Sequence, residues 1–216
     1  MGAWTWLGAY LSALVGTVGC GLSLDSACVA QQAAGFGWSV PAGIAVLGGV
    51  SLMGGQWALL AINRVGRWRA LLTLAISGIG TLLTGAIEAL LVAACGWLML
   101  GHSPRLMVLL PRVLIALAPY WLGFLVVLPY TGPGVARILK VWHLLVLWQL
   151  LRPVLDASGA NALLVAGIAW LAAQAFDVVV DRSPLRLRER LFRLVSGSPG
   201  WTGRDLMASA EMEQTR

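Results

Sequence analysis

The chain has 216 residues, of which 59% are hydrophobic and only 11% are charged, and its mean hydropathy is +0.82. Soluble domains carry about 25% charged residues, so a water-soluble fold could not bury this much apolar surface, whereas lipid can cover it. The composition therefore excludes a soluble domain, and the net charge of +6, which lies largely at the C-terminal end, favours a membrane surface and not nucleic acid as a partner.

Six apolar stretches, separated by charged or turn-forming residues, predict an all-α, multi-pass transmembrane helical bundle of about six spans over residues 1–180. A helix needs about 20 mostly apolar residues to cross the hydrocarbon core. The stretches that satisfy this are residues 3–23, 39–62, 71–100, 109–130, 134–152 and 159–179.

The first stretch follows no basic residue, so we interpret it as a retained span and not as a secretory signal. A lipoprotein cleavage site at Thr17–Cys20 is the alternative. Small residues recur every four positions in this stretch, at Gly8, Ser12, Gly16 and Cys20. This pattern allows close approach of another helix.

Two further spans have features of their own. The third stretch is longer than an upright span needs, so we expect it to tilt. Pro119 and Pro129 should kink or end the fourth span, because proline donates no backbone hydrogen bond. Five tryptophans lie near span ends, where indoles sit among lipid headgroups: Trp4, Trp6, Trp38, Trp68 and Trp97.

The basic residues predict which side of the membrane each loop faces. With six spans, alternate loops share a side, and one side collects Arg64, Arg67, Arg69, Arg137, Lys140 and the arginines from Arg182 to Arg216. Arg105, Arg112 and Arg152 fall on the other side. The positive-inside rule then places both termini in the cytoplasm. Because arginine is used almost to the exclusion of lysine, we expect a bacterial protein of the plasma (inner) membrane.

Glu88 lies near the middle of the third span, where an ionised carboxylate costs about 3 kcal/mol. At 100° per residue it shares a helix face with other polar side chains: Ser77, Thr81, Thr84 and Cys95. This stripe should point into the bundle. Two interpretations are open. Glu88 relays protons or ions with Lys140 or His143 of the fifth span as its partner, or a protonated Glu88 joins two helices by a hydrogen bond.

Cys20 and Cys28 flank the first outward loop. On the oxidising face of a bacterial inner membrane these two cysteines could form a disulfide. Cys95 lies within a span, where we expect it to be inert.

Signatures of enzymes and metal sites are missing from the sequence. It contains no Gly-x-Ser-x-Gly, no Gly-Lys-Ser/Thr phosphate loop and no His-Glu-x-x-His. A metal site needs several His, Cys or carboxylate groups at close spacing, and the chain has 2 His. Asp177 and Asp181 share a helix face beside Arg182, which a charge-paired helix end explains. We expect no catalytic residue, no cofactor and no metal.

Residues 181–197 predict a basic amphipathic helix that lies in the cytoplasmic headgroup layer. Ser183 and Pro184 suit its start and Gly197 its end. Its apolar half consists of Leu185, Leu187, Leu191, Phe192, Leu194 and Val195. Its polar half includes Arg186, Arg190 and Arg193, which should contact anionic lipid headgroups. Residues 198–216 are small and polar, and we expect a disordered cytoplasmic tail.

Residues 96–151 resemble the core of the Yip family, small membrane proteins named for their interaction with Ypt/Rab GTPases, and the resemblance extends over about 40–178. The similar elements are Gly96-Trp97, Gly101-His102, Arg112-Val113-Leu114, Ala118-Pro119-Tyr120, Leu128-Pro129, Ile138 and Val141-Trp142. Residues 62–65 also resemble cyanobacterial relatives, which would make the thylakoid an alternative location. The resemblance implies a helical bundle without enzymatic activity and, for eukaryotic members, a role in vesicle trafficking and membrane shaping. The chain lacks their long polar N-terminal region, so GTPase binding is not carried over.

Two classes of function follow. The first is a non-enzymatic scaffold or a membrane-organising or trafficking-type factor, whose partner is another membrane protein or a second copy of itself. The alternative is a small ion- or proton-coupled transporter that uses Glu88. Transport needs a polar path between the two faces, and no second span offers a comparable acidic residue. We therefore prefer the scaffold.

Overall fold

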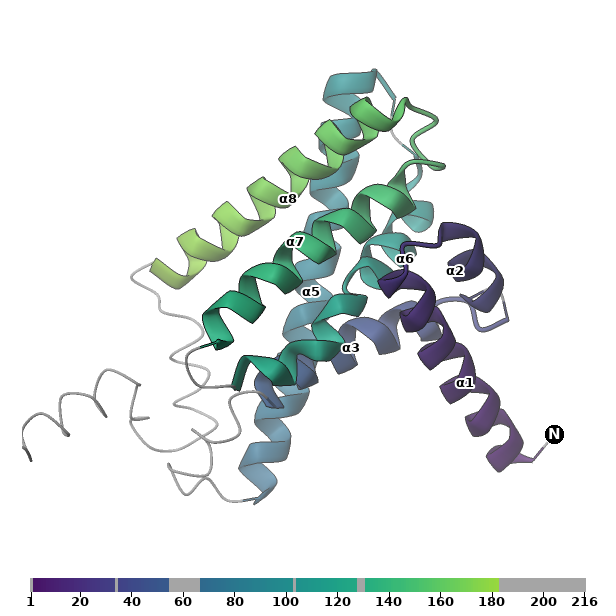
Figure 1. The fold of residues 1–216 in the computed structure, drawn as a ribbon, viewed down its shortest axis with the longest axis vertical. Helices are drawn as coiled ribbons and strands as arrows, with labels where there is room; N and C mark the ends of the chain where they lie inside the picture. Colours follow the sequence, from purple (N-terminus) through teal and green to yellow (C-terminus); the bar gives the residue numbers. More distant parts are fainter. Residues whose placement is uncertain (1, 34, 55–66, 103, 128–130, 183–216) are drawn as a thin grey trace, which may run out of the picture.

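The computed structural model describes residues 2–33, 35–54, 67–102, 104–127 and 131–182, and the elements in these ranges are all helices (Figure 1). In chain order they are α1 (Ala3–Leu22), α2 (Ser26–Ala33), α3 (Ser39–Gly54), α5 (Arg67–Leu100), α6 (Leu106–Ala116), the 3-10 helix η1 (Ala118–Val127), α7 (Gly132–Leu151) and α8 (Gly159–Arg182). Within these ranges, 5 helical stretches are long and apolar enough to cross a membrane. The all-α fold predicted from the sequence is therefore confirmed for the described residues, and their long apolar helices agree with the predicted membrane-embedded bundle.

The long helices follow the predicted spans, with one extension. α5 has 34 residues and begins at Arg67, before the predicted start. At 1.5 Å per residue it is about 50 Å long, well over the roughly 30 Å of the hydrocarbon core. α3 has 16 residues and covers the first part of the predicted span 39–62; residues 55–62 of that span lie outside the described ranges.

The fourth predicted span changes its helix type partway. α6 ends at Ala116, and Ala118–Val127 continues as a 3-10 helix of 10 residues. Pro119, at the second position of η1, cannot donate the backbone hydrogen bond that an α-helix would need there. The break predicted at Pro119 is thus where the winding tightens, and Pro129 lies outside the described residues.

The first outward loop contains a helix that the sequence analysis treated as a connection. The side chain of Asp25 accepts a hydrogen bond from the backbone N–H of Cys28 at 2.9 Å, which is the N-cap contact that starts a helix. The helix α2 follows over Ser26–Ala33 and packs beside the C-terminal half of α1. The expectation of a simple loop was wrong for residues 26–33, because an N-cap residue followed by an alanine-rich stretch forms a helix there.

The interior forms where α3 crosses between α5 and η1. Glycines allow this close approach: a Cβ on Gly78 would lie 3.0 Å from the carbonyl oxygen of Val46, and one on Gly123 would lie 2.9 Å from Cα of Leu52. Most of the hydrophobic core is aliphatic, and its most buried side chains include Val40 and Ile44 of α3, Leu109 of α6 and Leu147 of α7.

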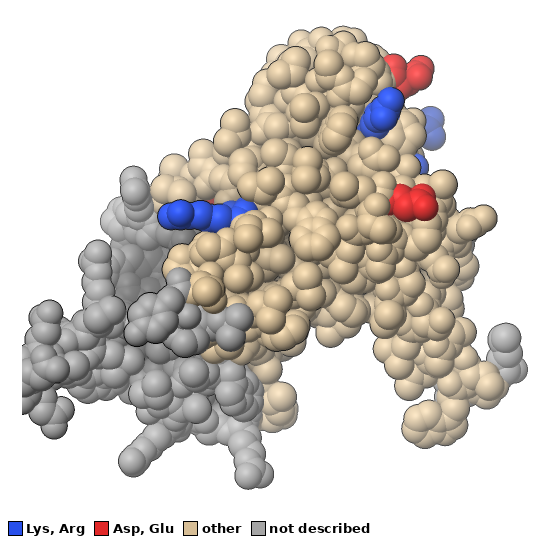
Figure 2. Space-filling view, in the orientation of Figure 1, with Lys and Arg blue, Asp and Glu red and all other residues tan. Residues whose placement is uncertain are grey.

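The connections predicted to face outward lie together at one end of the bundle. Nε2 of His102, after α5, lies 3.1 Å from the carbonyl oxygen of Leu155, after α7. Ser26, at the start of α2, lines a shallow pocket with Arg152 and Asp156. On the face in Figure 2, charged side chains gather at a few places near the edges, and a broad uncharged area lies between them. That area suits contact with hydrocarbon.

Candidate functional site

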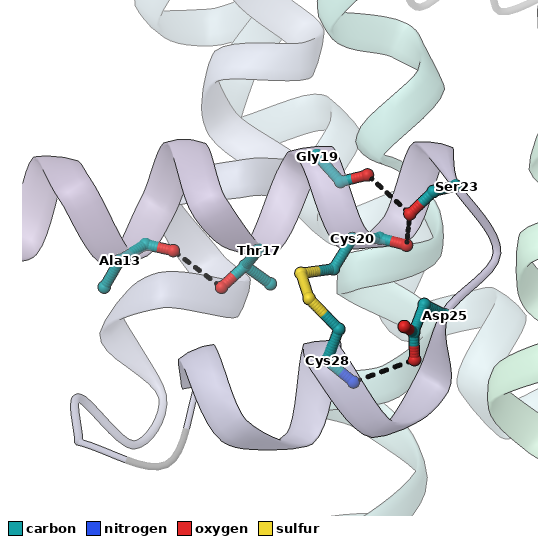
Figure 3. Close-up of a disulfide and its surroundings, with 7 residues drawn as sticks. All are labelled: Ala13, Thr17, Gly19, Cys20, Ser23, Asp25 and Cys28. Carbon is teal, nitrogen blue, oxygen red and sulfur yellow. Dashed lines mark hydrogen bonds between the residues drawn. A yellow bond between two sulfur atoms is a disulfide. The ribbon is translucent and has the colours of Figure 1, made fainter.

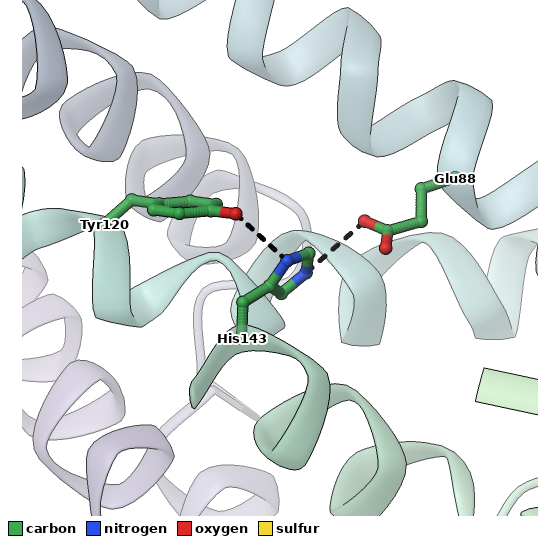
Figure 4. A network of polar contacts seen from close by, with 3 residues as sticks. All are labelled: Glu88, Tyr120 and His143. Carbon is green, nitrogen blue, oxygen red and sulfur yellow. Dashed lines mark hydrogen bonds and ion pairs between the residues drawn. The ribbon is translucent and has the colours of Figure 1, made fainter. Parts of the chain in front are cut away.

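Three polar side chains from three elements meet inside the bundle (Figure 4). Glu88 comes from α5, His143 from α7 and Tyr120 from η1. Oε2 of Glu88 lies 3.3 Å from Nε2 of His143, and the Tyr120 hydroxyl lies 3.3 Å from Nδ1 of the same ring. The two rings of Tyr120 and His143 also pack at a centroid distance of 5.3 Å. We call these three residues the polar triad.

The polar stripe of α5 explains how Glu88 comes to face inward. Near the start of the stripe, the Ser77 hydroxyl donates to the carbonyl oxygen of Gly49 in α3 at 2.9 Å. Thr81 and Thr84 donate instead to carbonyl oxygens of their own helix, those of Ser77 and Gly80. One turn beyond Thr84, Glu88 extends from the same face toward α7. The stripe therefore satisfies its hydroxyl groups locally and leaves the carboxyl group to meet another helix.

Because the polar triad is buried, its net charge affects the stability of the fold. The side chains of Glu88 and His143 are each only 3% exposed. Oε1 of Glu88 has no hydrogen-bond partner among the described residues, and Nε2 of His143 lies near Oε2 without hydrogen-bond geometry. A bare carboxylate in so apolar a setting is costly. A carboxyl and an imidazole that hold one proton between them are neutral overall, either as an ion pair or as two uncharged groups.

Of the two partners considered for Glu88, the structure brings His143 to it and not Lys140. Nζ of Lys140 donates to Oε1 of Gln174 in α8 at 2.6 Å, in an exposed position. Lys140 lies about one turn before His143 on α7, toward the end where that helix begins. Its ammonium group can therefore remain at the membrane interface while its stem lies along apolar surface.

Tyr120 is the member of the polar triad that the sequence analysis did not assign to a site. Its position depends on η1, whose contacts with α3 are specific: Nε1 of Trp121 donates to the carbonyl oxygen of Ile44 at 3.0 Å, and the Ser51 hydroxyl donates to the carbonyl oxygen of Trp121 at 2.7 Å. A tyrosine directly after Pro119 was the available signal. Its direction could not be derived, because it follows from the change to 3-10 winding.

Cys20 and Cys28 lie together where α2 folds back on α1, and the structure joins them by a disulfide (Figure 3). Their Cα atoms are 5.6 Å apart, within the usual range for a disulfide. Farther along, α2 also lies close to α1: a Cβ added at Gly16 would lie only 3.0 Å from Oε1 of Gln32. The small residues Gly16 and Cys20 thus face α2, whereas Gly8 and Ser12 are exposed.

The remaining candidates have simpler surroundings. Within the described ranges, no group of three or more His, Cys, Asp or Glu side chains could hold a metal ion. The shallow pocket at the outward end is lined by Ser26, Gln149, Arg152, Pro153, Asp156 and Ala157. The predicted lipid-contacting arginines, Arg186, Arg190 and Arg193, lie outside the described residues, as does most of the helix 181–197 and the whole tail 198–216.

Comparison of the chain with protein-family models, with curated proteins and with solved structures found no match.

Proposed function

We propose that the protein is a non-enzymatic integral membrane scaffold, a membrane-organising factor whose buried polar triad holds its own helices in register. The burial of the polar triad carries this proposal: Glu88 and His143 are each 3% exposed, whereas a transport site must meet water on each side in turn. In a low-dielectric interior, a polar contact between helices specifies their packing strongly, because leaving either partner alone is costly.

The proposed placement is a bacterial plasma membrane, or a thylakoid membrane if the protein is cyanobacterial. The chain would cross it six times, with both termini in the cytoplasm and a C-terminal helix at the lipid surface. The arginines Arg186, Arg190 and Arg193 would contact anionic headgroups in that placement. The Yip-like resemblance of residues 40–178 supports a trafficking or membrane-shaping role of this class. We do not extend it to GTPase binding.

A scaffold needs a surface for its partner, and the N-terminal half of α1 offers an exposed one. Its N-terminal end leans away from the other helices (Figure 1). A Cβ added at Gly8 would meet nothing within 4 Å, and Ser12, one turn further, is also exposed. Small residues four apart allow another helix to come close. A second copy of the chain or another membrane protein would pack there.

The test is co-purification of full-length protein in mild detergent, carried out with two differently tagged copies of this chain and with identification of other bound proteins. Gly8→Leu with Ser12→Leu should reduce the bound partner at least several-fold, because leucine blocks close helix approach. Gly80→Leu is the matched control, since Gly80 is also exposed on a long helix with nothing within 4 Å of its added Cβ. Equal loss in both variants, or no stoichiometric partner for the native chain, would argue against the scaffold.

Ion- or proton-coupled transport is the second candidate, and the unpartnered Oε1 of Glu88 favours it. In proteoliposomes with a pH gradient, transport predicts a proton flux that Glu88→Gln abolishes and that Lys140→Gln leaves largely intact. A flux no greater than that of empty vesicles would remove this candidate.

A further inference from the structure

The polar triad contains atoms that the packing leaves unsatisfied. Oε1 of Glu88 and Nε2 of His143 are buried without a hydrogen-bond partner, and Nε1 of Trp170 in α8 is in the same condition. A buried polar atom without a partner loses the hydration that it had in water and gains nothing in return. The folded chain retains this arrangement in the middle of a predicted span, where ionisable groups are rare and mark functional sites.

Neutrality limits how many protons the polar triad can hold. With Glu88 ionised and His143 uncharged, the site carries a bare negative charge in an apolar interior. With both groups protonated, it carries a bare positive charge. One proton held by the pair keeps the site neutral whether it sits on the carboxyl or on the imidazole.

Tyr120 connects that proton to the backbone of η1. The hydroxyl of Tyr120 lies 3.3 Å from Nδ1 of His143, and it is the contact through which η1 reaches the site. A 3-10 run of 10 residues is far longer than the usual three to four residues, and such stretches mark hinges or strain. The other polar contacts of η1 lead to α3, through Trp121 and Ser51.

We propose that the polar triad is an intramembrane proton-binding site, in which Glu88 and His143 share one exchangeable proton, and that loss of this proton loosens η1 from α7. The proton passes to water at the end of the bundle where α7 begins. The site then carries a negative charge, which is relieved when water enters between α5, α7 and η1. This inference goes beyond the scaffold function and does not depend on the existence of a partner.

Other charged groups near the site belong to α7 and α8. Lys140 lies one turn before His143 on α7 and is held by Gln174, and Arg137 lies a further turn away and is exposed. Asp177 of α8 and Glu88 are the acidic groups that act electrostatically on the Tyr120 hydroxyl. α3 contains no titratable side chain. On α6, Arg112 donates to the carbonyl oxygen of Val108 within its own helix.

Hydrogen exchange of the η1 backbone measures the proposed loosening directly in the full chain. The closed form holds one proton more than the opened form, so closing is favoured at low pH and opening grows as pH rises. After correction for intrinsic exchange, protection is expected to depend on pH. Above the pH at which the shared proton is released, the protection factors of residues 118–127 should fall by up to about tenfold for each further pH unit. Peptides from α8 should show no such decline.

Two substitutions test whether the decline comes from the polar triad. Glu88→Gln keeps the shape of the carboxyl group but cannot release a proton, so the protection of η1 should no longer depend on pH. Glu88→Met, which also fills the space of the side chain and cannot ionise, should have the same effect, and it serves as the second variant if Glu88→Gln folds poorly. Thr84→Val is the matched control: Thr84 shares the stripe of Glu88 but bonds its own helix at Gly80, so the native pH response should persist.

The outcomes are distinct from those of the co-purification test. A pH-dependent loss of protection in the native chain and in Thr84→Val, absent from both triad variants, would support the site whether or not a partner is found. If the native chain shows no such loss, or if Glu88→Gln retains it, the proton-binding site is refuted.

Discussion

At the scale of single residues, the interior depends on glycines that let backbones approach each other. Gly123 of η1 is the clearest case, because an added Cβ would lie 2.9 Å from Cα of Leu52 and 2.8 Å from its Cδ2. Those distances are too short for real carbon contacts, and Cα cannot move without the helix. The α3–η1 crossing must therefore open if this hydrogen is replaced by a methyl group.

Gly123→Ala should accordingly destabilise the protein by about 1–3 kcal/mol, the usual cost of overpacking a closed interior. Gly80→Ala is the control, because Gly80 is exposed on α5 with nothing within 4 Å. It should be neutral or slightly stabilising, since alanine favours a helix by up to about 1 kcal/mol over glycine. Thermal unfolding of both variants in the same mild detergent measures the difference, and equal stabilities would contradict the crossing.

Only part of the candidate site could be predicted from residue patterns. The position of Glu88 on a polar stripe and the presence of His143 one turn from Lys140 could be derived, because helical periodicity places residues on faces. The choice between His143 and Lys140 could not, because it depends on the rotation of α7 about its axis. Tyr120 was missed for a related reason: after Pro119 the chain leaves α-helical periodicity, and the usual 100° per residue no longer assigns it a face.

At the scale of elements, the disulfide decides whether α2 stays folded against α1. The two helices also contact each other through Gly16 and Gln32, but α2 has only 8 residues, and helices that short are unstable in isolation. An N-cap such as Asp25 typically stabilises a helix by about 1 kcal/mol. A covalent connection at Cys28 thus compensates for a helix that could not persist alone.

Alkylation in intact cells measures that connection. In a Cys95→Ala background, Cys20 and Cys28 should resist a thiol reagent until a reductant is added, after which both should react. Cys20→Ser is the control, because it leaves the partly exposed Cys28 without a partner and should make it reactive before reduction. Equal labelling of the two-cysteine protein with and without reductant would rule out the disulfide.

The C-terminal helix predicted at 181–197 can be tested as a peptide covering 181–198. Its apolar half needs lipid or protein to cover it, and its arginines each gain about 1 kcal/mol near an anionic leaflet. The peptide should be unstructured in buffer and become helical on anionic vesicles, less so with added salt. Leu187→Ser, Leu191→Ser and Leu194→Ser together should abolish the helical circular dichroism, and Arg190→Gln with Arg193→Gln should only weaken it. If the native peptide stays disordered on these vesicles, its apolar face must contact a protein and not lipid.

At the scale of the whole molecule, the long helices could be located from hydropathy because lipid imposes one length on every span. The course of the chain between α1 and α5 could not, because α2 and α3 are short and owe their positions to tertiary contacts. The Tyr10 hydroxyl, in the middle of α1, donates to the carbonyl oxygen of Ser39 at 3.0 Å. α3 therefore starts partway down α1 and not at the bundle end, which no periodicity in residues 39–54 reveals.

The positions of the loops nevertheless support the proposed six-span topology. α1 ends beside α2, whose Ser26 lines a pocket with Arg152 and Asp156, and α5 ends beside His102, which contacts Leu155. The C-terminal ends of α1 and α5 thus lie at the same end of the bundle. Because α5 is long enough to span the core, its start at Arg67 belongs to the opposite end. The six-span proposal therefore predicts one crossing between α1 and α5 and an even number of crossings in all.

Reporter fusions that are active only in the cytoplasm test this topology. A reporter placed between Arg64 and Arg69 and one fused after Arg216 should both be active, because the positive-inside rule retains the arginine-rich side. A reporter inserted at Asp156, in the connection between α7 and α8, should be inactive, since that loop lies with His102 at the other end. Replacing Arg64, Arg67 and Arg69 with Gln should lower the activity of the first reporter more than replacing Arg105 and Arg152 does, because only the former set holds its loop inside. Activity at just one of the two arginine-rich positions would mean an odd number of crossings between them and would contradict the six-span proposal.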